Sequence, residues 1–182
     1  MKEFEEKTLK TKKIFNGKII SLQVDDVELP DGSTSKREIV KHPGAVAVIP
    51  ITEEGKIIFV KQYRKPLERS LLEIPAGRLE EGEEPVTTAK RELEEETGYT
   101  AEDFSFVASF YTSPGFADEI IHIYETNTLK KLEIPVEKDE DEFLSIVELT
   151  LEEAVKAVEN KQIHDAKTNY AVLYLQQTMK RK

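Results

Sequence analysis

The segment from Gly77 to Tyr99 constrains the chain most, because it places three glutamates on one face of a predicted helix. A glycine turn leads into this helix, and Glu92, Glu95 and Glu96 stand at positions i, i+3 and i+4. Like charges at that spacing destabilise a helix unless a positive group neutralises them. A hard divalent cation, Mg²⁺ or Mn²⁺, would do so, whereas a solvated acidic face is the simpler interpretation of glutamates alone.

The composition of the whole chain excludes or disfavours several kinds of partner and site. Its 182 residues carry a formal net charge of −10, which disfavours nucleic acid because phosphate backbones attract basic surfaces. The chain has no cysteine, so disulfides and thiolate metal sites are excluded. The longest apolar run, 45–51, is too short to span a bilayer, and the first residues lack the apolar core of a signal peptide. We therefore expect a cytoplasmic protein with no membrane partner.

The order of the predicted elements favours the α/β class. Residues 1–42 predict a small β-strand segment, which is too small to bury a core alone and should pack on the main domain or on a partner subunit. Residues 43–182 predict the main domain, in which the apolar run 44–51 forms a strand buried on both faces. The alternation of strands and helices then indicates a mixed sheet with helices on both faces.

The acidic helix has clear start and stop signals. Proline suits the first turn of a helix and glycine suits its end, so the helix is predicted from Pro85 to about Thr97, with Gly98 as the stop. Helical spacing predicts that Val86, Ala89 or Lys90, and Leu93 form the side that packs on the core.

The spacing within this segment is more specific than its acidity. It runs glycine, five residues, glutamate, seven residues, arginine-glutamate, an apolar residue, any residue, two glutamates, any residue and glycine. This pattern resembles the motif of the Nudix hydrolases. The residues that carry the resemblance are Gly77, Glu83, Arg91, Glu92, Leu93, Glu95, Glu96 and Gly98.

The resemblance implies an α/β/α sandwich and hydrolysis of a nucleoside diphosphate linked to another group. Cleavage of a pyrophosphate needs a nucleophilic water and relief of charge on the phosphoryl oxygens, and divalent metals supply both. By resemblance, Glu92 and Glu96 are direct metal ligands, Glu95 lies beside them, and the carbonyl of Ala76 is a further ligand. Glu96 also counts among the catalytic residues. Mg²⁺ is the expected cofactor, with Mn²⁺ as an alternative.

The remaining candidate catalytic residues are Arg91 and residues of the acidic run 137–142. Arg91 would hold a carboxylate in place, with Glu83 as its partner, because a guanidinium binds carboxylates bidentately. An acidic run such as 137–142 is often only a solvated loop. The resemblance instead implies a loop that closes on the metals, with Glu140 as the catalytic base and Glu142 as a metal contact, and these two roles could be exchanged.

A second motif indicates which subfamily the chain resembles. Pro114 lies 16 residues after Gly98, within Ser113-Pro114-Gly115, and Glu119 follows. A proline at that distance resembles the ADP-ribose pyrophosphatases, although a Ser-Pro-Gly segment is also an ordinary turn. The resemblance implies hydrolysis of ADP-ribose to AMP and ribose 5-phosphate, with this loop contacting the substrate. The alternatives are another substrate, such as a nucleotide sugar, a dinucleoside polyphosphate or NADH, or a noncatalytic nucleotide-sensing module.

Three charged residues outside the motifs match substrate-contacting positions of that subfamily. Arg64 follows a predicted core strand and resembles the phosphate-binding arginine, while Arg37 and Glu38 precede the first core strand. Each could instead be a surface charge. The resemblance also implies a homodimer whose N-terminal strands cross to the partner and complete its substrate site, and the segment 1–42 fits that use.

Overall fold

The computed structural model describes residues 3–134, 136 and 143–179. The chain forms two compact units. Unit 1 contains residues 1–44 and 110–120, and unit 2 contains residues 45–109 and 121–182. Each unit is described by itself below.

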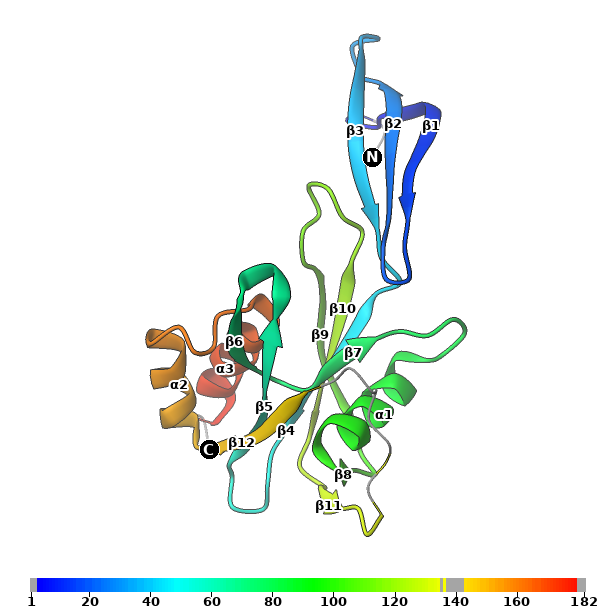
Figure 1. The fold of residues 1–182 in the computed structure, drawn as a ribbon. Coiled ribbons are helices and arrows are strands. Elements are labelled where there is room, and N and C mark those ends of the chain that lie inside the picture. The colour runs from blue at the N-terminus through cyan, green and yellow to red at the C-terminus, as the bar shows by residue number, and fades with distance from the viewer. Residues whose placement is uncertain (1–2, 135, 137–142, 180–182) are drawn as a thin grey trace. The chain divides into compact units, whose positions relative to one another are not determined.

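Unit 1 is built on an antiparallel sheet in the order β1-β2-β3. Its strands are β1 (Lys7–Asn16), β2 (Ser21–Glu28) and β3 (Thr34–Lys41) (Figure 1). Every residue of β1 is exposed. The segment 110–120 joins this unit through a parallel bridge between Val40 and Ala117.

The strands of unit 2 form two main sheets. In the order β7-β4-β10-β9, β4 runs parallel to β10 and antiparallel to β7, while the order β12-β5-β6 is antiparallel. A short pair, β8 and β11, completes the unit. The strands that lie wholly or mainly in unit 2 are β4 (Ala45–Pro50), β5 (Ile57–Arg64), β6 (Arg69–Glu73), β7 (Ala76–Arg78), β8 (Tyr99–Thr100), β9 (Ser105–Tyr111), β10 (Ile120–Thr126), β11 (Lys130–Lys131) and β12 (Leu144–Leu149).

Helices pack against these strands from two sides. Figure 1 shows α1 (Pro85–Thr97) on one side of the strands of unit 2, with α2 (Leu151–Glu159) and α3 (Ala166–Met179) on the other. The short 3₁₀ helix η1 (Lys65–Leu67) follows β5. The predicted α/β class with a mixed sheet is confirmed, and all six residues of β4 are buried as expected. No helix in the described ranges has the length and apolarity needed to cross a membrane.

Helix α1 has the predicted bounds but a different inner face. Pro85 occupies its first turn, and Gly98 ends it with φ at 71° while its N–H bonds the carbonyl of Glu94 at 2.9 Å. Ala89 and Leu93 are fully buried, but the expectation that Val86 and Lys90 lie on the inner face is wrong, because Val86 is 43% exposed and Lys90 is exposed as well. The inner face continues instead through polar side chains, namely Thr88, Glu92, Glu96 and Thr97.

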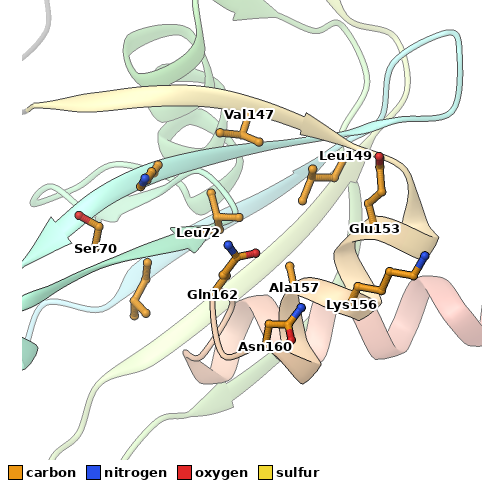
Figure 2. Close-up of a pocket in the computed structure, with 11 residues that line it drawn as sticks. Ser70, Leu72, Val147, Leu149, Glu153, Lys156, Ala157, Asn160 and Gln162 are labelled. Atoms are coloured by element: carbon orange, nitrogen blue, oxygen red, sulfur yellow. The ribbon is translucent and has the colours of Figure 1, made fainter.

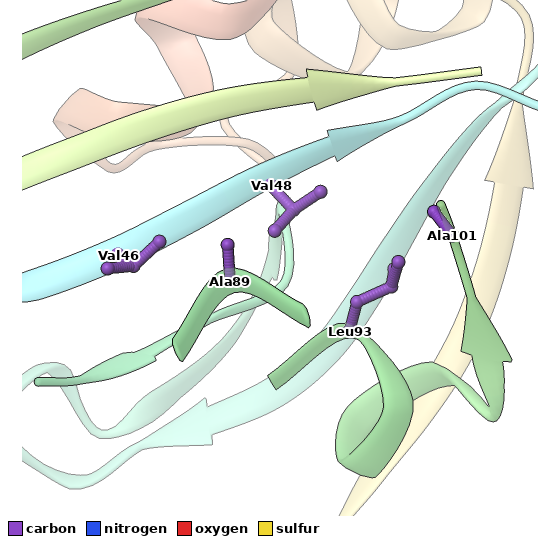
Figure 3. Packing of buried hydrophobic residues seen from close by; sticks show 5 residues of the cluster. All are labelled: Val46, Val48, Ala89, Leu93 and Ala101. Atoms are coloured by element: carbon purple, nitrogen blue, oxygen red, sulfur yellow. The ribbon is translucent and has the colours of Figure 1, made fainter. Parts of the chain in front are cut away.

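The apolar part of this face packs directly on the central strand. Ala89 and Leu93 lie against Val46 and Val48 of β4, and Ala101 closes the cluster behind the helix (Figure 3). This contact fixes the distance between α1 and the sheet, since neither helix residue has any exposed surface. It therefore also fixes how far the glutamates of α1 stand from β4 and its neighbour β7.

We expect Leu93→Ala to lower the free energy of unfolding by about 2–5 kcal/mol, because it leaves a cavity between α1 and β4. Val86→Ala removes apolar carbon from the same helix at an exposed position and should cost less than about 1 kcal/mol. Urea unfolding of both variants checks this. Equal losses would mean that α1 is not held by the Leu93 contact.

Candidate active site around helix α1

The backbone of β7 and the carboxylate of Glu92 touch. Gly77 pairs with Val46 of β4, which places it under α1. A Cβ atom built at Gly77 would lie 1.9 Å from both Cδ and Oε1 of Glu92. No side chain can be accommodated at that distance, so only glycine lets this carboxylate approach the strand.

A hydrogen bond fixes Glu96 to the same strand. Glu96 is 2% exposed, and its Oε2 accepts a hydrogen bond of 2.9 Å from the backbone N–H of Ala76. Ala76 is paired with Ala47 of β4, so its backbone is held on the other side as well. Two glutamates of α1 thus meet two successive residues of β7.

Arg91 binds three of the carboxylates around it. Its Nη1 donates to Oε1 of Glu92 at 2.8 Å and to Oε2 of Glu95 at 2.9 Å. Its Nη2 and Nε donate to the two oxygens of Glu83 at 3.3 and 3.4 Å. Burial lowers the pKa of Arg91, but the hydrogen bonds that it donates to Glu83 and the charges of Glu92 and Glu95 outweigh this and raise the pKa.

Arg91 therefore supplies positive charge to the acidic face from within the helix itself. The metal ion that the sequence predicted at this face would add to that charge. One guanidinium nevertheless binds three carboxylates, namely those of Glu83, Glu92 and Glu95, so the ionised carboxylates outnumber the positive charge among them. A cation can reduce this excess further.

The candidate ligand atoms are of the type that a hard cation prefers. All candidate ligands are oxygens, which Mg²⁺ and Mn²⁺ prefer, and each carboxylate oxygen pair can accept more than one contact. The carboxylate of Glu92 also lies against the backbone of Gly77. In the part of the chain that the structure describes, no three His, Cys, Asp or Glu side chains already form a group that could hold a metal ion.

A second charged group lies on β5, β6 and α3. Arg64, the predicted phosphate-binding residue, donates from Nε and Nη2 to the two oxygens of Glu73, both at 2.7 Å. Lys167 donates to the same carboxylate. Burial raises the pKa of Glu73, but the Arg64 hydrogen bond and the Lys167 charge outweigh it and lower the pKa to about 2. Sequence reasoning missed Glu73, although a glutamate within the apolar stretch 71–74 is a signal.

The predicted substrate residues of β3 lie in unit 1. Arg37 donates from Nε to Glu6 at 2.8 Å and from Nη1 to Ser35 at 3.0 Å, so its guanidinium already holds a carboxylate. Glu38 is exposed and pairs with Val24 of β2 in the sheet. The structure thus shows Arg37 in an ion pair and Glu38 on an open surface.

The loop that follows β9 also lies in unit 1. The carbonyl of Ser113 accepts hydrogen bonds from the N–H groups of Phe116 and Ala117 at 3.1 and 2.9 Å, which closes a turn over Pro114 and Gly115. Glu119 accepts a hydrogen bond of 2.5 Å from the hydroxyl of Thr112. The loop is therefore internally ordered. Glu140 and Glu142, the proposed base and metal contact, lie outside the described residues.

Unit 2 also contains a cavity away from the residues predicted to act. It measures about 630 Å³ and lies between α2 and the sheet β12-β5-β6, where Leu72, Val147 and Leu149 face Lys156 and Gln162 (Figure 2). None of the site residues predicted from the sequence lines it. We therefore place the candidate active site at α1 and β7.

Comparison with known proteins gives matches from residue 6 to residue 171. Residues 41–171 match the model of the NUDIX domain, and residues 6–40 match that of the nucleoside diphosphate sugar hydrolase N-terminal domain. A solved structure described as an ADP compounds hydrolase has a TM-score of 0.85 at 22% identity and covers 97% of this chain and 95% of its own. That likeness supports the fold alone.

Curated relatives are considerably closer in sequence. The chain is 62% identical to the ADP-ribose pyrophosphatase of Bacillus subtilis (strain 168), over 97% of this chain and 95% of the relative. It is 63% identical to the methanol dehydrogenase activator of Bacillus methanolicus, over 96% and 95%. It is 35% identical to the ADP-ribose pyrophosphatase of Mycobacterium tuberculosis (strain ATCC 25618 / H37Rv), over 87% and 77%.

We expect Gly77→Ala to lower the free energy of unfolding by about 1–3 kcal/mol, because its methyl group would overlap the carboxylate of Glu92. The matched control is Gly115→Ala, where an added Cβ meets nothing within 4 Å and φ is not positive. That variant should change stability by less than about 0.5 kcal/mol. Urea unfolding measures both, and a Gly77→Ala protein as stable as the control would contradict the close approach.

Proposed function

Because the chain belongs to the Nudix hydrolase family, we propose that it hydrolyses the pyrophosphate bond of ADP-ribose, giving AMP and ribose 5-phosphate. Membership confirms the family predicted from the motif. The substrate proposal is carried by one observation, the 62% identity to the Bacillus subtilis ADP-ribose pyrophosphatase over nearly the whole of both chains.

We propose Mg²⁺, with Mn²⁺ as a substitute, as the cofactor of this reaction. The residues that would hold it are Glu92, Glu95, Glu96 and the carbonyl of Ala76, and Glu142 is the further candidate. Bound there, the metal would lower the pKa of a water molecule and offset charge on the diphosphate oxygens. The all-oxygen donor set and the glycine under Glu92 support this assignment.

The protein groups around the carboxylates would keep them in place during the reaction. Arg91 restrains Glu92 and Glu95 through Nη1, and the N–H of Ala76 restrains Glu96. Restrained ligands need little reorganisation when charge develops on the phosphoryl group. We propose Glu140 as the base that takes the proton from the attacking water, with Glu142 as the alternative.

The substrate contacts are proposed from the resemblance and from charge. Arg64 uses two of its five N–H donors on Glu73, and its side chain is 39% exposed, which leaves donors that suit a phosphate. The remaining proposed contacts come from unit 1. They are Arg37, Glu38, Ser113, Pro114, Gly115 and Glu119.

A second candidate function follows from the Bacillus methanolicus relative. The chain is as similar to this methanol dehydrogenase activator as to the Bacillus subtilis enzyme, at 63% against 62% identity. Identity alone therefore does not separate the two. Addition of the chain to a methanol dehydrogenase assay distinguishes them, since an activator raises the dehydrogenase rate and a pyrophosphatase need only release AMP.

We expect the purified chain to release AMP from ADP-ribose with Mg²⁺, to lose this activity in EDTA, and to regain it when Mg²⁺ is restored. Glu96→Gln should lower turnover by at least about 100-fold, which corresponds to roughly 3 kcal/mol of activation free energy. The control Glu94→Gln changes a glutamate of the same helix outside the carboxylate group and should retain activity. Reaction in H₂¹⁸O identifies the attacked phosphorus by the product that carries the label.

A substrate panel decides the outcome of this experiment. Faster release from a nucleotide sugar, a dinucleoside polyphosphate or NADH than from ADP-ribose would replace the substrate. Turnover with none of them, while ADP-ribose still binds, would leave a nucleotide-sensing module in place of an enzyme.

We also propose that the chain is a homodimer in which the strands of unit 1 contact the partner subunit. All of β1 is exposed, and Leu9, Ile14 and Phe15 expose about half of their surface. A three-stranded sheet with such a surface needs a further layer to cover its apolar side chains.

We expect sedimentation equilibrium to give twice the chain mass of 20.8 kDa. Phe15→Asp should shift the equilibrium toward the monomer by placing a charge in the contact, whereas Lys13→Asp on the same strand serves as the charge control. A wild-type protein that sediments as a monomer at micromolar concentration would contradict the dimer.

A further inference from the structure

A buried carboxylate on β6 is held from two sides. The side chain of Glu73 is 3% exposed, and Arg64 of the neighbouring strand β5 grips both of its oxygens at 2.7 Å. Lys167 at the start of α3 donates to Oε2 of the same carboxylate. An ionised carboxylate at this depth needs such partners, because burial without them is strongly unfavourable.

The lysine side of this group is anchored in α3. Lys167 donates to Oδ1 of Asp165 at 2.9 Å, and the same oxygen accepts the N–H of Thr168 at 3.1 Å. The hydroxyl of Thr168 accepts the N–H of Ile74, the residue that follows Glu73. Helix α3 is therefore tied to the end of β6 by two sets of hydrogen bonds, and Glu73 cannot move independently of it.

The guanidinium of Arg64 has N–H donors that Glu73 does not use. A guanidinium carries five N–H donors, and Arg64 uses two of them on Glu73. Among the described residues, Arg64 donates to no other acceptor, and its side chain is 39% exposed. The Glu73 hydrogen bond raises the pKa of Arg64 and outweighs the lowering effect of burial, and the charges of Glu73, Glu96 and Asp165 add to the increase.

We propose that Glu73 is a positioning residue that holds the guanidinium of Arg64 in a fixed orientation, with its remaining N–H donors available to the diphosphate of the substrate. This inference rests on the proposed function, since it assigns the ligand of Arg64. A free arginine loses rotamer entropy when it is fixed in one geometry, and this loss weakens binding. Glu73 fixes it before the substrate arrives, so binding does not bear that cost.

Binding of the non-hydrolysable analogue α,β-methylene-ADP-ribose tests this without turnover. In calorimetry with Mg²⁺, Glu73→Gln should weaken binding by about tenfold, because the amide removes the charge and faces Nη2 with a donor. Arg64→Ala should weaken binding at least as much. The double variant should bind no more weakly than Arg64→Ala, since Glu73 acts only through Arg64.

Lys167→Met is the matched control. It removes the other partner of Glu73 and should lower the melting temperature, but Lys167 does not contact Arg64, so affinity should stay within about twofold of wild type. In steady-state assays, Glu73→Gln should raise KM by about tenfold with kcat changed by less than about threefold. A purely structural ion pair would give the opposite pattern, with lower stability and unchanged KM.

Each outcome has a defined meaning. If Glu73→Gln binds the analogue as wild type does, or if its effect multiplies with that of Arg64→Ala, the positioning role is overturned while the proposed function stands. If wild type does not bind the analogue at all, the proposed function itself is overturned. Should Glu73→Gln fail to fold, Arg64→Lys makes the test, because it keeps the charge but cannot form the two-point contact, and wild-type affinity would overturn the proposal.

Discussion

The contact between two glutamates of α1 and two successive residues of β7 is the constraint on which the rest of the site depends. Glu92 lies against the backbone of Gly77, and Glu96 accepts the N–H of Ala76. Both contacts require α1 to lie at one distance from the sheet. The fully buried Leu93 sets that distance against β4. An apolar contact thus positions the polar chemistry one turn away on the same helix.

Two arginines of unit 2 interact with carboxylates in different ways. Arg91 lies among carboxylates and restrains Glu83, Glu92 and Glu95. Arg64 is itself restrained by one buried carboxylate, Glu73, and keeps N–H donors that Glu73 does not use. The first arrangement orders negative groups that suit a cation, and the second orders a positive group that suits a phosphate. A metal-assisted cleavage of a diphosphate needs both kinds of group.

The sequence predicted those features that depend on local spacing. The bounds of α1, the glycine below it, the buried strand β4 and the Nudix family all follow from residues close together in the chain. The sequence did not predict which face of α1 is buried. Apolar periodicity predicted a buried Val86, whereas the glutamates occupy the inner face instead. The contact of Arg91 with Glu95, four residues on, adds a positive charge from within the helix to the one that the sequence predicted from a metal ion.

Contacts between residues that are far apart in the chain could not be predicted from the sequence, and the reason is physical. Lys167 and Glu73 are 94 residues apart, and neither belongs to a motif with fixed spacing. Their contact depends on how α3 packs on β6, which the hydrogen bond from Ile74 to Thr168 secures. A charged residue inside an apolar strand nevertheless signals that some partner must exist, because a buried carboxylate without one is strongly destabilising. Such a residue therefore predicts a long-range ion pair, although the identity of the partner comes only from the fold.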